Sequence, residues 1–537
     1  MIDLEDTKNP KEKNNEVVNG VLFGLLIVIL IFGLIQIKDY GLSFDEGTEL
    51  NTMLKTYSYA EGVTSHLLSG SEWTDESDYM SYADNIYGVA VRYPVYLIIK
   101  EMELGFRETF LLLHFYTYLW FTAAVLALYF LLKSFHYSKT VRIIGCIIFC
   151  LSPRIFAESA YNIKDVMFLA LFLITMNAGV VALKKRKFRY LLFFSFLTAL
   201  SINTRCIGGI ILLPVVLLYG KENYAQNKKL LPAIGKAVGI CFMTYACFYF
   251  VTPYIWTNPI TNTMTILKSF RDYSDGVMEM IFNGKHYLSN QLPWYYLIEW
   301  MVITTPILTL ILFCIGGWRT VKEITEIVLK HRKSKVEKLY ENSLVIIFIM
   351  ILVLDGILQP VKYDGWRHFY FMYGLGFVIT VKGIDFLWSV IQKQKRIIQI
   401  GSLGVIGIAM GITVGWMIQN HPYGYVYFNE IARIYEKDNF ERDYWFVSTY
   451  DAMEEILQIN KQDNIKIFCL CRTSMYLLTD QERQRITFTD LPGEAQYIIL
   501  QYRNAGIDET KGLIDNQSMI SEKTVDGLPI YTIYYAQ

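Results

Sequence analysis

The chain has 537 residues, of which 53% are hydrophobic and 15% aromatic, and its 50 basic residues balance its 50 acidic ones. This composition is too apolar for a soluble multidomain protein and is typical of a polytopic membrane protein with some extramembrane mass. A net charge near zero gives no electrostatic reason to expect a nucleic-acid partner. The eight cysteines lie mostly within apolar stretches, which argues against a disulfide framework or a zinc site.

The apolar stretches predict the fold class. A transmembrane helix needs about 20 mostly apolar residues, and by that measure we expect roughly eleven such helices. They are predicted at 18–37, 108–132, 141–153, 165–183, 190–203, 206–220, 232–252, 296–318, 343–359, 368–388 and 398–418. We therefore expect a mainly α, polytopic membrane protein with a small C-terminal α/β domain. The tail over 1–17 has no signal-peptide pattern, so the first span is expected to be retained.

The loops between these spans predict the orientation. One set is strongly basic, as in KKRKFR at 184–189 and QKQKR at 392–396, and the positive-inside rule places it in the cytoplasm together with the N-terminal tail. The other loops, with the C-terminal segment, then lie outside the cell membrane. The expected domains are a cytoplasmic tail over 1–17, a transmembrane module over 18–420, and an extracytoplasmic linker and small domain over 421–537.

The outer loops at 38–107 and 253–295 are too long to be simple connectors. We expect interfacial helices in both, including one over 263–282. From about residue 440, a helix-like segment and several alternating apolar segments predict helices and strands. The expected role of this small domain is a structural or acceptor-recognition cap.

The outer loops also hold the unusual charged residues. Asp45 and Glu46 lie just beyond the first span, where acids at a helix N-terminus are one explanation and a catalytic base is another. Five basic side chains near the outer ends of spans could each be an interfacial anchor, but their joint position favours an anion at headgroup depth. These five are Arg154, Lys164, Arg205, Arg367 and His368.

Sugar transfer from a polyprenyl-phosphate donor needs both kinds of group. The lipid phosphate leaves readily, so the enzyme must supply a base for the acceptor hydroxyl and positive charge for the departing phosphate. Asp45 or Glu46 could be the base in an inverting displacement. Asp165 could instead be the nucleophile of a retaining mechanism. Candidate substrate contacts, which an ordinary aromatic belt or loop would also explain, are Tyr161, Asn162, His286, Trp294, Tyr363 and Trp366.

Several of these segments, taken in order, resemble the GT-C superfamily of membrane glycosyltransferases, and within it bacterial protein-mannosyltransferase-like members (glycosyltransferase family 39-like). FDEG at 44–47 is similar to the acidic first-loop motif of that superfamily. SPRIFAESAYNIKDVMFLALF at 152–172 and YDGWRHFYFMY at 363–373 also resemble family segments. The chain departs from the family pattern at Met167, where a proline is expected, and at Glu158, where a neutral group is expected.

The resemblance implies an extracytoplasmic active site, a polyprenyl-phosphate sugar donor, and a protein, lipid or glycan acceptor. It implies that Asp45 is the base, Glu46 its acidic neighbour and Asp165 a supporting carboxylate. It assigns the donor phosphate to Arg154, Lys164, Arg367 and His368. It also admits a divalent metal near Asp45 and Glu46, although the sequence shows no strong ligand cluster, and no other cofactor is expected.

Two other hypotheses remain open. A transporter or flippase of lipid-linked sugars would carry charged or polar groups at mid-bilayer and often paired halves, whereas the charges here lie at the span ends. A non-catalytic scaffold or sensor would leave the concentration of acids and bases in the outer loops unexplained.

Overall fold

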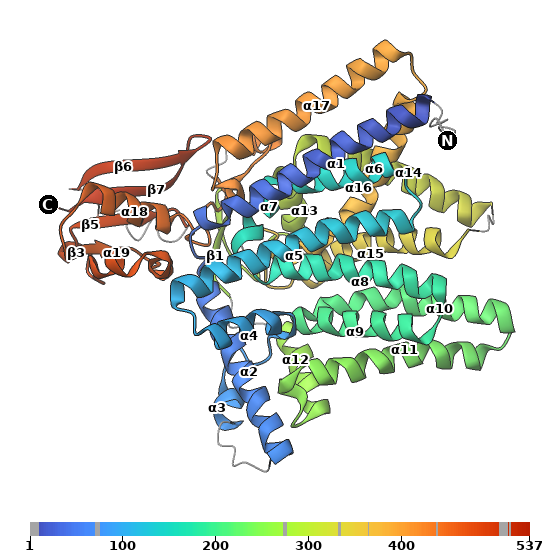
Figure 1. The fold of residues 1–537 in the computed structure, drawn as a ribbon, viewed down its shortest axis with the longest axis horizontal. Coiled ribbons are helices and arrows are strands. Elements are labelled where there is room, and N and C mark those ends of the chain that lie inside the picture. Colours follow the sequence, from blue (N-terminus) through green and yellow to red (C-terminus); the bar gives the residue numbers. More distant parts are fainter. Residues whose placement is uncertain are drawn as a thin grey trace, which may run out of the picture.

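The computed structural model describes residues 10–69, 76–271, 277–330, 334–363, 365–435, 439–503, 514 and 517–536. The first nine residues of the expected N-terminal tail, and parts of the expected outer loops at 70–75 and 272–276, lie outside this range. The structure is a helical bundle with a small mixed α/β domain at one end (Figure 1).

Long helices make up the bundle. They are α1 (Pro10–Gln36), α5 (Phe106–Ser134), α6 (Lys139–Cys150), α7 (Pro153–Tyr161), α8 (Asp165–Lys185), α9 (Phe188–Thr204), α10 (Leu212–Asn227), α11 (Leu230–Val251), α13 (Tyr296–Ile303), α14 (Ile307–Leu329), α15 (Val336–Leu358), α16 (Phe371–Ile391) and α17 (Arg396–Gln419). Helix α8 lies at the centre, with 83% of its apolar window buried. The mainly α fold class is confirmed.

All eleven predicted spans coincide with helices. Among the described residues, eight helices are long and apolar enough by themselves to cross a membrane, and the bent pair α6–α7 would make nine. The two helices of that pair meet at 70°, because Pro153 has no backbone N–H to continue the first helix and instead begins the second. The remaining two predictions fall on α9, which has 17 residues, and on α13–α14, which is interrupted before Ile307.

Helices α14 and α16 pack very closely. A Cβ atom added to Gly316 would lie 1.8 Å from the backbone oxygen of Ile379, and one added to Gly383 would lie 2.0 Å from that of Leu312. Small residues at these positions let the two backbones approach, which is how helices associate in a membrane without a hydrophobic driving force.

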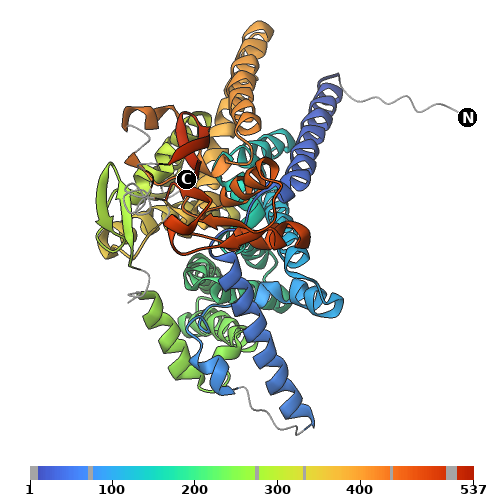
Figure 2. The same ribbon diagram turned by 90° about the vertical axis from the view of Figure 1, so that its left-hand side faces the viewer.

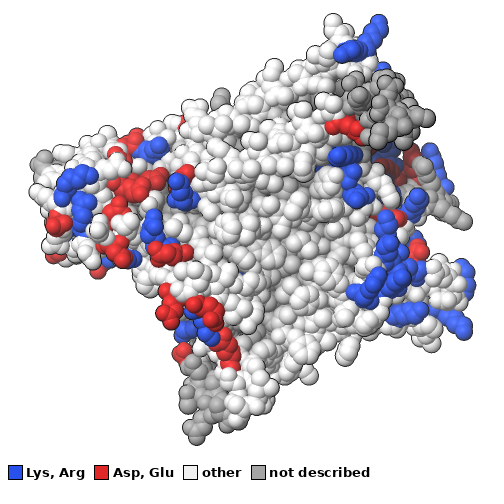
Figure 3. Space-filling view, in the orientation of Figure 1, with Lys and Arg blue, Asp and Glu red and all other residues white. Residues whose placement is uncertain are grey.

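The expected outer loops lie at the same end of the bundle as the small domain (Figure 1). The loop at 38–107 contains α2 (Glu46–Ser69), α3 (Glu76–Ser81) and α4 (Tyr93–Met102). Lys and Arg gather at the opposite end of the visible face, and a wide uncharged band separates the two ends (Figure 3). This distribution agrees with the expected orientation, which stays a prediction.

The helix predicted over 263–282 is wrong in its second half. Helix α12 (Pro259–Arg271) is followed by an antiparallel hairpin of β1 (Glu279–Phe282) and β2 (Lys285–Leu288), in which Phe282 pairs with Lys285. The turn residues Asn283 and Gly284 both have positive φ, 52° and 68°. An Asn-Gly pair between two short apolar runs is a strong local signal for such a turn.

The C-terminal domain contains α18 (Thr449–Ile459), α19 (Asp480–Gln484) and a five-stranded mixed sheet. Its strands are β3 (Ile465–Phe468), β4 (Ile486–Phe488), β5 (Tyr497–Gln501), β6 (Ser518–Val525) and β7 (Leu528–Tyr535), in the order β4-β3-β5-β7-β6. Strand β3 is parallel to both neighbours, whereas β5, β7 and β6 are antiparallel. The expected α/β character of this segment is therefore present.

Candidate active site

The segment that carries Asp45 is held between the bundle and the C-terminal domain. The backbone N–H of Leu42 donates to Oγ of Ser474 at 3.2 Å, and the N–H of Phe44 donates to the carbonyl of Trp445 at 3.1 Å. These contacts place Asp45 directly before the first turn of α2. Asp45 therefore has the helix-terminal position that its sequence context predicts, and it also lies where the C-terminal domain meets the membrane module.

Arg367 joins two acidic side chains at this position. Its Nη1 lies 3.3 Å from Oδ2 of Asp45 and 3.6 Å from Oδ2 of Asp165. Asp165 is 1% exposed and also forms an ion pair with Arg205 and accepts a hydrogen bond from Asn162. The guanidinium of Arg367 lies 4.1 Å from the ring centre of Trp445. Segments far apart in the sequence thus converge on one arginine.

A second group of ion pairs lies beside the first. Oε1 of Glu49 lies 3.0 Å from Nζ of Lys164, and Oε2 of Glu49 lies 2.6 Å from Nη1 of Arg92. Burial opposes ionisation of Glu49, but the two cations outweigh it and lower the pKa of its carboxyl to about 2. Glu49 is therefore a permanent anion that holds Lys164 in place. We call Asp45, Glu49, Arg92, Lys164, Asp165, Arg205 and Arg367 the outer charge cluster.

Asp45 differs from the other two carboxylates of this cluster. Its side chain is 37% exposed, whereas those of Glu49 and Asp165 are 13% and 1% exposed. Burial raises the pKa of Asp45, Arg367 counteracts that rise, and Glu49 adds to it. Of the two carboxylate oxygens of Asp45, only Oδ2 has a hydrogen-bond partner among the described residues, so Oδ1 is left for another molecule. A partly exposed carboxylate with a raised pKa has the properties of a general base.

These groups line a narrow pocket. Its volume is about 10 Å³, which is room for about one water molecule. Its wall is formed by Ser43, Asp45, Glu46, Glu49, residues 161–164, Arg367 and Trp445. A sugar phosphate does not fit this arrangement, so binding requires movement of the lining side chains.

Glu46 lies in the wall, away from Arg367. Its Oε1 lies 2.8 Å from Nε2 of His114 in α5, and its Oε2 accepts a hydrogen bond from the N–H of Ser43 at 2.7 Å. With 1% of the residue exposed, Glu46 fixes the start of α2. The buried Glu158 likewise accepts hydrogen bonds from Asn162 and Tyr370, and so it orients Asn162 towards Asp165.

The other predicted basic residues have different positions. Arg154 is buried with its guanidinium over the rings of Trp300 and Phe428, at 5.2 and 5.7 Å, and does not line the pocket. Burial, with the nearby Arg367 second, lowers the pKa of His368 well below its usual range. His368 is therefore neutral at pH 7 and can offer a hydrogen bond but no charge.

The predicted substrate contacts divide into two groups. Tyr161 and Asn162 line the pocket, and the ring of Tyr363 lies 4.8 Å from the guanidinium of Arg367. Trp366 is 3% exposed and donates its indole N–H to Thr304 at 2.9 Å, within the core. His286 pairs with Glu279 on the β1–β2 hairpin, and Trp294 is 61% exposed; neither lines the pocket.

Three residues of the site were not among the predicted ones. Glu49 lies one helical turn after Asp45, and this four-residue spacing could have placed both on one face. Arg92 and Trp445 come from segments without any local signal, because their partners are distant in the sequence. Trp445 belongs to the C-terminal segment, from about residue 440, that was expected to form the small α/β domain, so this segment contributes directly to the pocket.

The donor set does not suit a divalent metal. Within the described ranges, there is no group of three or more His, Cys, Asp or Glu side chains arranged to hold one. The carboxylates nearest Asp45 are already paired with cations, as Glu49 is with Lys164 and Arg92. A metal ion would have to displace these partners.

The sequence matches no protein-family model and no curated protein. The fold is similar to two crystal structures of ArnT from Cupriavidus metallidurans. For the one bound to undecaprenyl phosphate, the TM-score is 0.45 with 11% identity, over 96% of this chain and 97% of that one. For the apo structure, the TM-score is 0.43 with 12% identity, over 98% of each chain. Neither likeness is close enough to assign a function to this chain.

Proposed function

We propose that this chain is a membrane glycosyltransferase that moves a sugar from a polyprenyl-phosphate-linked donor to an extracytoplasmic acceptor. The observation that carries the proposal is the meeting of Asp45, Lys164 and Arg367 in one pocket beside the ends of the apolar helices. A base and two cations at the edge of the apolar region are what this transfer needs, because the donor phosphate is anchored there by its lipid.

Asp45 is the proposed base. In an inverting displacement, the free Oδ1 would take the proton of the acceptor hydroxyl as the oxygen attacks the anomeric carbon, and the bond to phosphate would break on the opposite side of the sugar. Polyprenyl phosphate would leave with the bonding electron pair. Asp165 is a poor nucleophile for the retaining alternative, since it is buried and already paired with Arg205 and Arg367.

Arg367 and Lys164 are the proposed phosphate ligands. An arginine fork binds phosphate oxygens in a bidentate manner, and lysine adds a point charge. A phosphate at Arg367 would compete with the long contact to Asp45. Donor binding would then release the base and widen the pocket at the same time. Neutral His368 could donate a further hydrogen bond.

The acceptor class stays open among protein, lipid and glycan. The flippase hypothesis lacks a comparable observation, since the outer charge cluster lies beside span ends and not across the bilayer centre.

The test is a transfer assay on the full-length protein in liposomes. Radiolabelled polyprenyl-phosphate hexoses and pentoses are supplied together with an extract of the source membranes as acceptor. The expected result is protein-dependent release of unglycosylated polyprenyl phosphate and label in a second product. Movement of intact donor between leaflets without bond cleavage would instead identify a transporter.

A further inference from the structure

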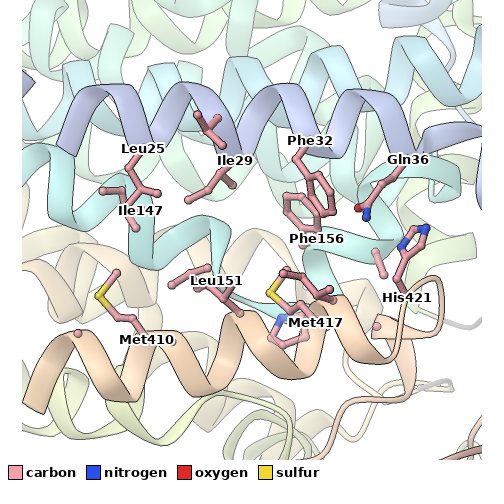
Figure 4. A pocket seen from close by; sticks show the side chains of 18 of the residues that line it. Leu25, Ile29, Phe32, Gln36, Ile147, Leu151, Phe156, Met410, Met417 and His421 are labelled. Atoms are coloured by element: carbon pink, nitrogen blue, oxygen red, sulfur yellow. The ribbon is translucent and has the colours of Figure 1, made fainter. Parts of the chain in front are cut away.

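A cavity of about 600 Å³ lies on another side of the molecule, between α1, the α6–α7 pair and α17. Figure 4 shows its apolar wall, which includes Ile29 and Phe32 from α1, Leu151 and Phe156 from the bent pair, and Met410 from α17. It shares no lining residue with the pocket around Asp45.

The two long helices that bound this cavity pack little against the rest of the protein. Only 11% of the apolar window of α1 and 6% of that of α17 is buried, and Figure 2 shows one end of each helix projecting beyond the bundle. Both are apolar enough to cross a membrane. The residues of α1 that line the cavity extend from Leu22 to Gln36, a length of about 21 Å at the rise of an α-helix. The cavity is therefore at a depth where hydrocarbon chains are present.

The end of the cavity nearest the C-terminal domain is polar. Gln36 is 8% exposed, points into the cavity, and has no hydrogen-bond partner among the described residues (Figure 4). His421, which also lines the cavity, lies 3.0 Å from Asp39. The side-chain amide of Gln36 is accessible from the cavity, so Gln36 marks a place where a ligand can offer a hydrogen bond.

A separate polar pocket of about 330 Å³ lies next to this end and shares no lining residue with the cavity. Asp39 and Pro422 line it, and they are respectively the ion-pair partner and the chain neighbour of His421. The other charged groups in its lining are of both signs: Lys38, Arg107, Asp451 and Glu454. A mixed lining with more acids than bases is unfavourable for a bare phosphate and complements a head group with many hydroxyls.

We propose that the cavity and the polar pocket together bind one glycolipid. Its hydrocarbon tail lies between α1 and α17, and its sugar head group lies beneath the C-terminal domain, beside Asp39 and Glu454. This site is separate from the donor phosphate ligands. Tyr40 lines the cavity and lies 5.9 Å from the ring of Tyr161, which lines the pocket of Asp45. The cavity and the pocket of Asp45 are therefore neighbours, and if the proposed function holds, the glycolipid bound here is the acceptor.

A second copy of the chain is the competing occupant. Gly407, Gly411 and Gly415 recur at four-residue intervals on α17, a spacing that favours pairing of membrane helices. A Cβ added at any of them meets nothing within 4 Å.

Binding is tested by native mass spectrometry of the full-length protein with monoglucosyl diacylglycerol as the probe, and with phosphatidylglycerol for comparison. Gly411→Phe places a ring in the cavity, whereas Gly404→Phe, equally open but outside the lining, is its matched control. We expect one bound glycolipid per chain, a loss of at least tenfold in affinity for Gly411→Phe, and a change below twofold for Gly404→Phe. Met410→Trp, with the exposed Ile412→Trp as control, repeats the test without changing a glycine.

Three results would overturn the proposal. They are equal binding by Gly411→Phe and Gly404→Phe, equal binding of phosphatidylglycerol and glycolipid, and loss of a dimer in Gly411→Phe while lipid binding is unchanged. Because the readout is binding, it is independent of sugar transfer. A protein that binds glycolipid without transferring sugar would contradict the proposed function and leave this site standing.

Discussion

The outer charge cluster has a counterpart near the other end of the bundle. There, Lys338 lies 2.9 Å from both Glu323 and Glu341, and Lys382 lies 3.0 Å from Glu323. We call these four residues the inner charge cluster. It joins α14, α15 and α16, and Tyr137, in the connection between α5 and α6, donates a hydrogen bond to Glu341. Both clusters are assembled from distant segments, and both contain buried carboxylates and cations.

The two clusters differ in whether they leave a carboxylate oxygen available to another molecule. Glu341 in the inner cluster is 1% exposed and has both a lysine and a tyrosine as partners. Asp45 in the outer cluster is 37% exposed and lines a pocket, and one of its carboxylate oxygens has no partner in the part of the chain that the structure describes. Buried ion pairs are by themselves weak evidence for stability. An acid left incompletely paired at a pocket is what separates a candidate site from a structural network.

The largest effect is expected for Asp45→Asn, which tests whether the outer charge cluster contains the base. Losing the base should lower the rate of sugar transfer by about 10²–10⁴-fold, while the melting temperature stays close to that of the unmodified protein because Asp45 is partly exposed. Asp78→Asn, which changes another acid of the same outer loop, should leave the rate unchanged. An Asp45→Asn enzyme with the full rate would remove Asp45 from the proposed role.

The matching change in the inner cluster is Lys382→Met. It removes a buried cation from Glu323 and leaves the side-chain oxygen of Asn342 without its lysine donor. Breaking a buried pair typically costs about 3–5 kcal/mol. We expect a clearly lower melting temperature with an unchanged rate per folded molecule. The exposed Lys393→Met is the control. A stable but inactive Lys382→Met would show that the inner charge cluster, like the outer one, is needed for sugar transfer.

Asp451 in the C-terminal domain should make the stability of the folded protein depend on pH. Burial raises the pKa of Asp451 to about 6 from its usual 3.8, although the hydrogen bond from Tyr423 opposes the rise. Because the folded state binds this proton more tightly, the stabilisation is full below about pH 4 and is lost as the pH rises through 6, at most about 3 kcal/mol.

We therefore expect the melting temperature to be higher at pH 5 than at pH 7.5, and Asp451→Asn to reduce that difference. Some of it should remain, since burial also raises the pKa of Asp443 to about 6. The exposed Asp480→Asn should reproduce the unmodified profile. An identical profile for Asp451→Asn would show that Asp451 is ionised in the folded protein at pH 5.

The smallest expected effect comes from Arg367→Lys. Lysine keeps the charge but loses the fork and the planar stacking on Trp445. We expect the KM for the donor to rise about tenfold with the acceptor KM unchanged. Arg472→Lys, in the C-terminal domain, should change neither. A rise in the KM for the acceptor alone would indicate that residues other than Arg367 bind the donor phosphate.

Local patterns predicted much of this protein. Apolar stretches located all eleven helical regions, and alternation located strands such as β5 and β7. The hairpin at Asn283–Gly284 was missed because the predicted helix was extended over β1 to Phe282, directly before the Asn-Gly turn signal. For the site, the sequence predicted Asp45, Lys164 and Arg367. It also predicted Glu46 as the acidic neighbour of the base and Trp366 as a substrate contact, although the structure pairs Glu46 with His114 and buries Trp366.

Membrane character and helix positions follow from the sequence itself, since the length and apolarity of a segment are local properties that the bilayer selects directly. Which charges meet is different. Arg367 reaches Asp45 across 322 positions, and ion pairing depends on how helices pack. Only the tertiary structure therefore decided that Glu49 holds Lys164, that Trp445 lies against Arg367, and that Asp45 has an oxygen unpaired among the described residues.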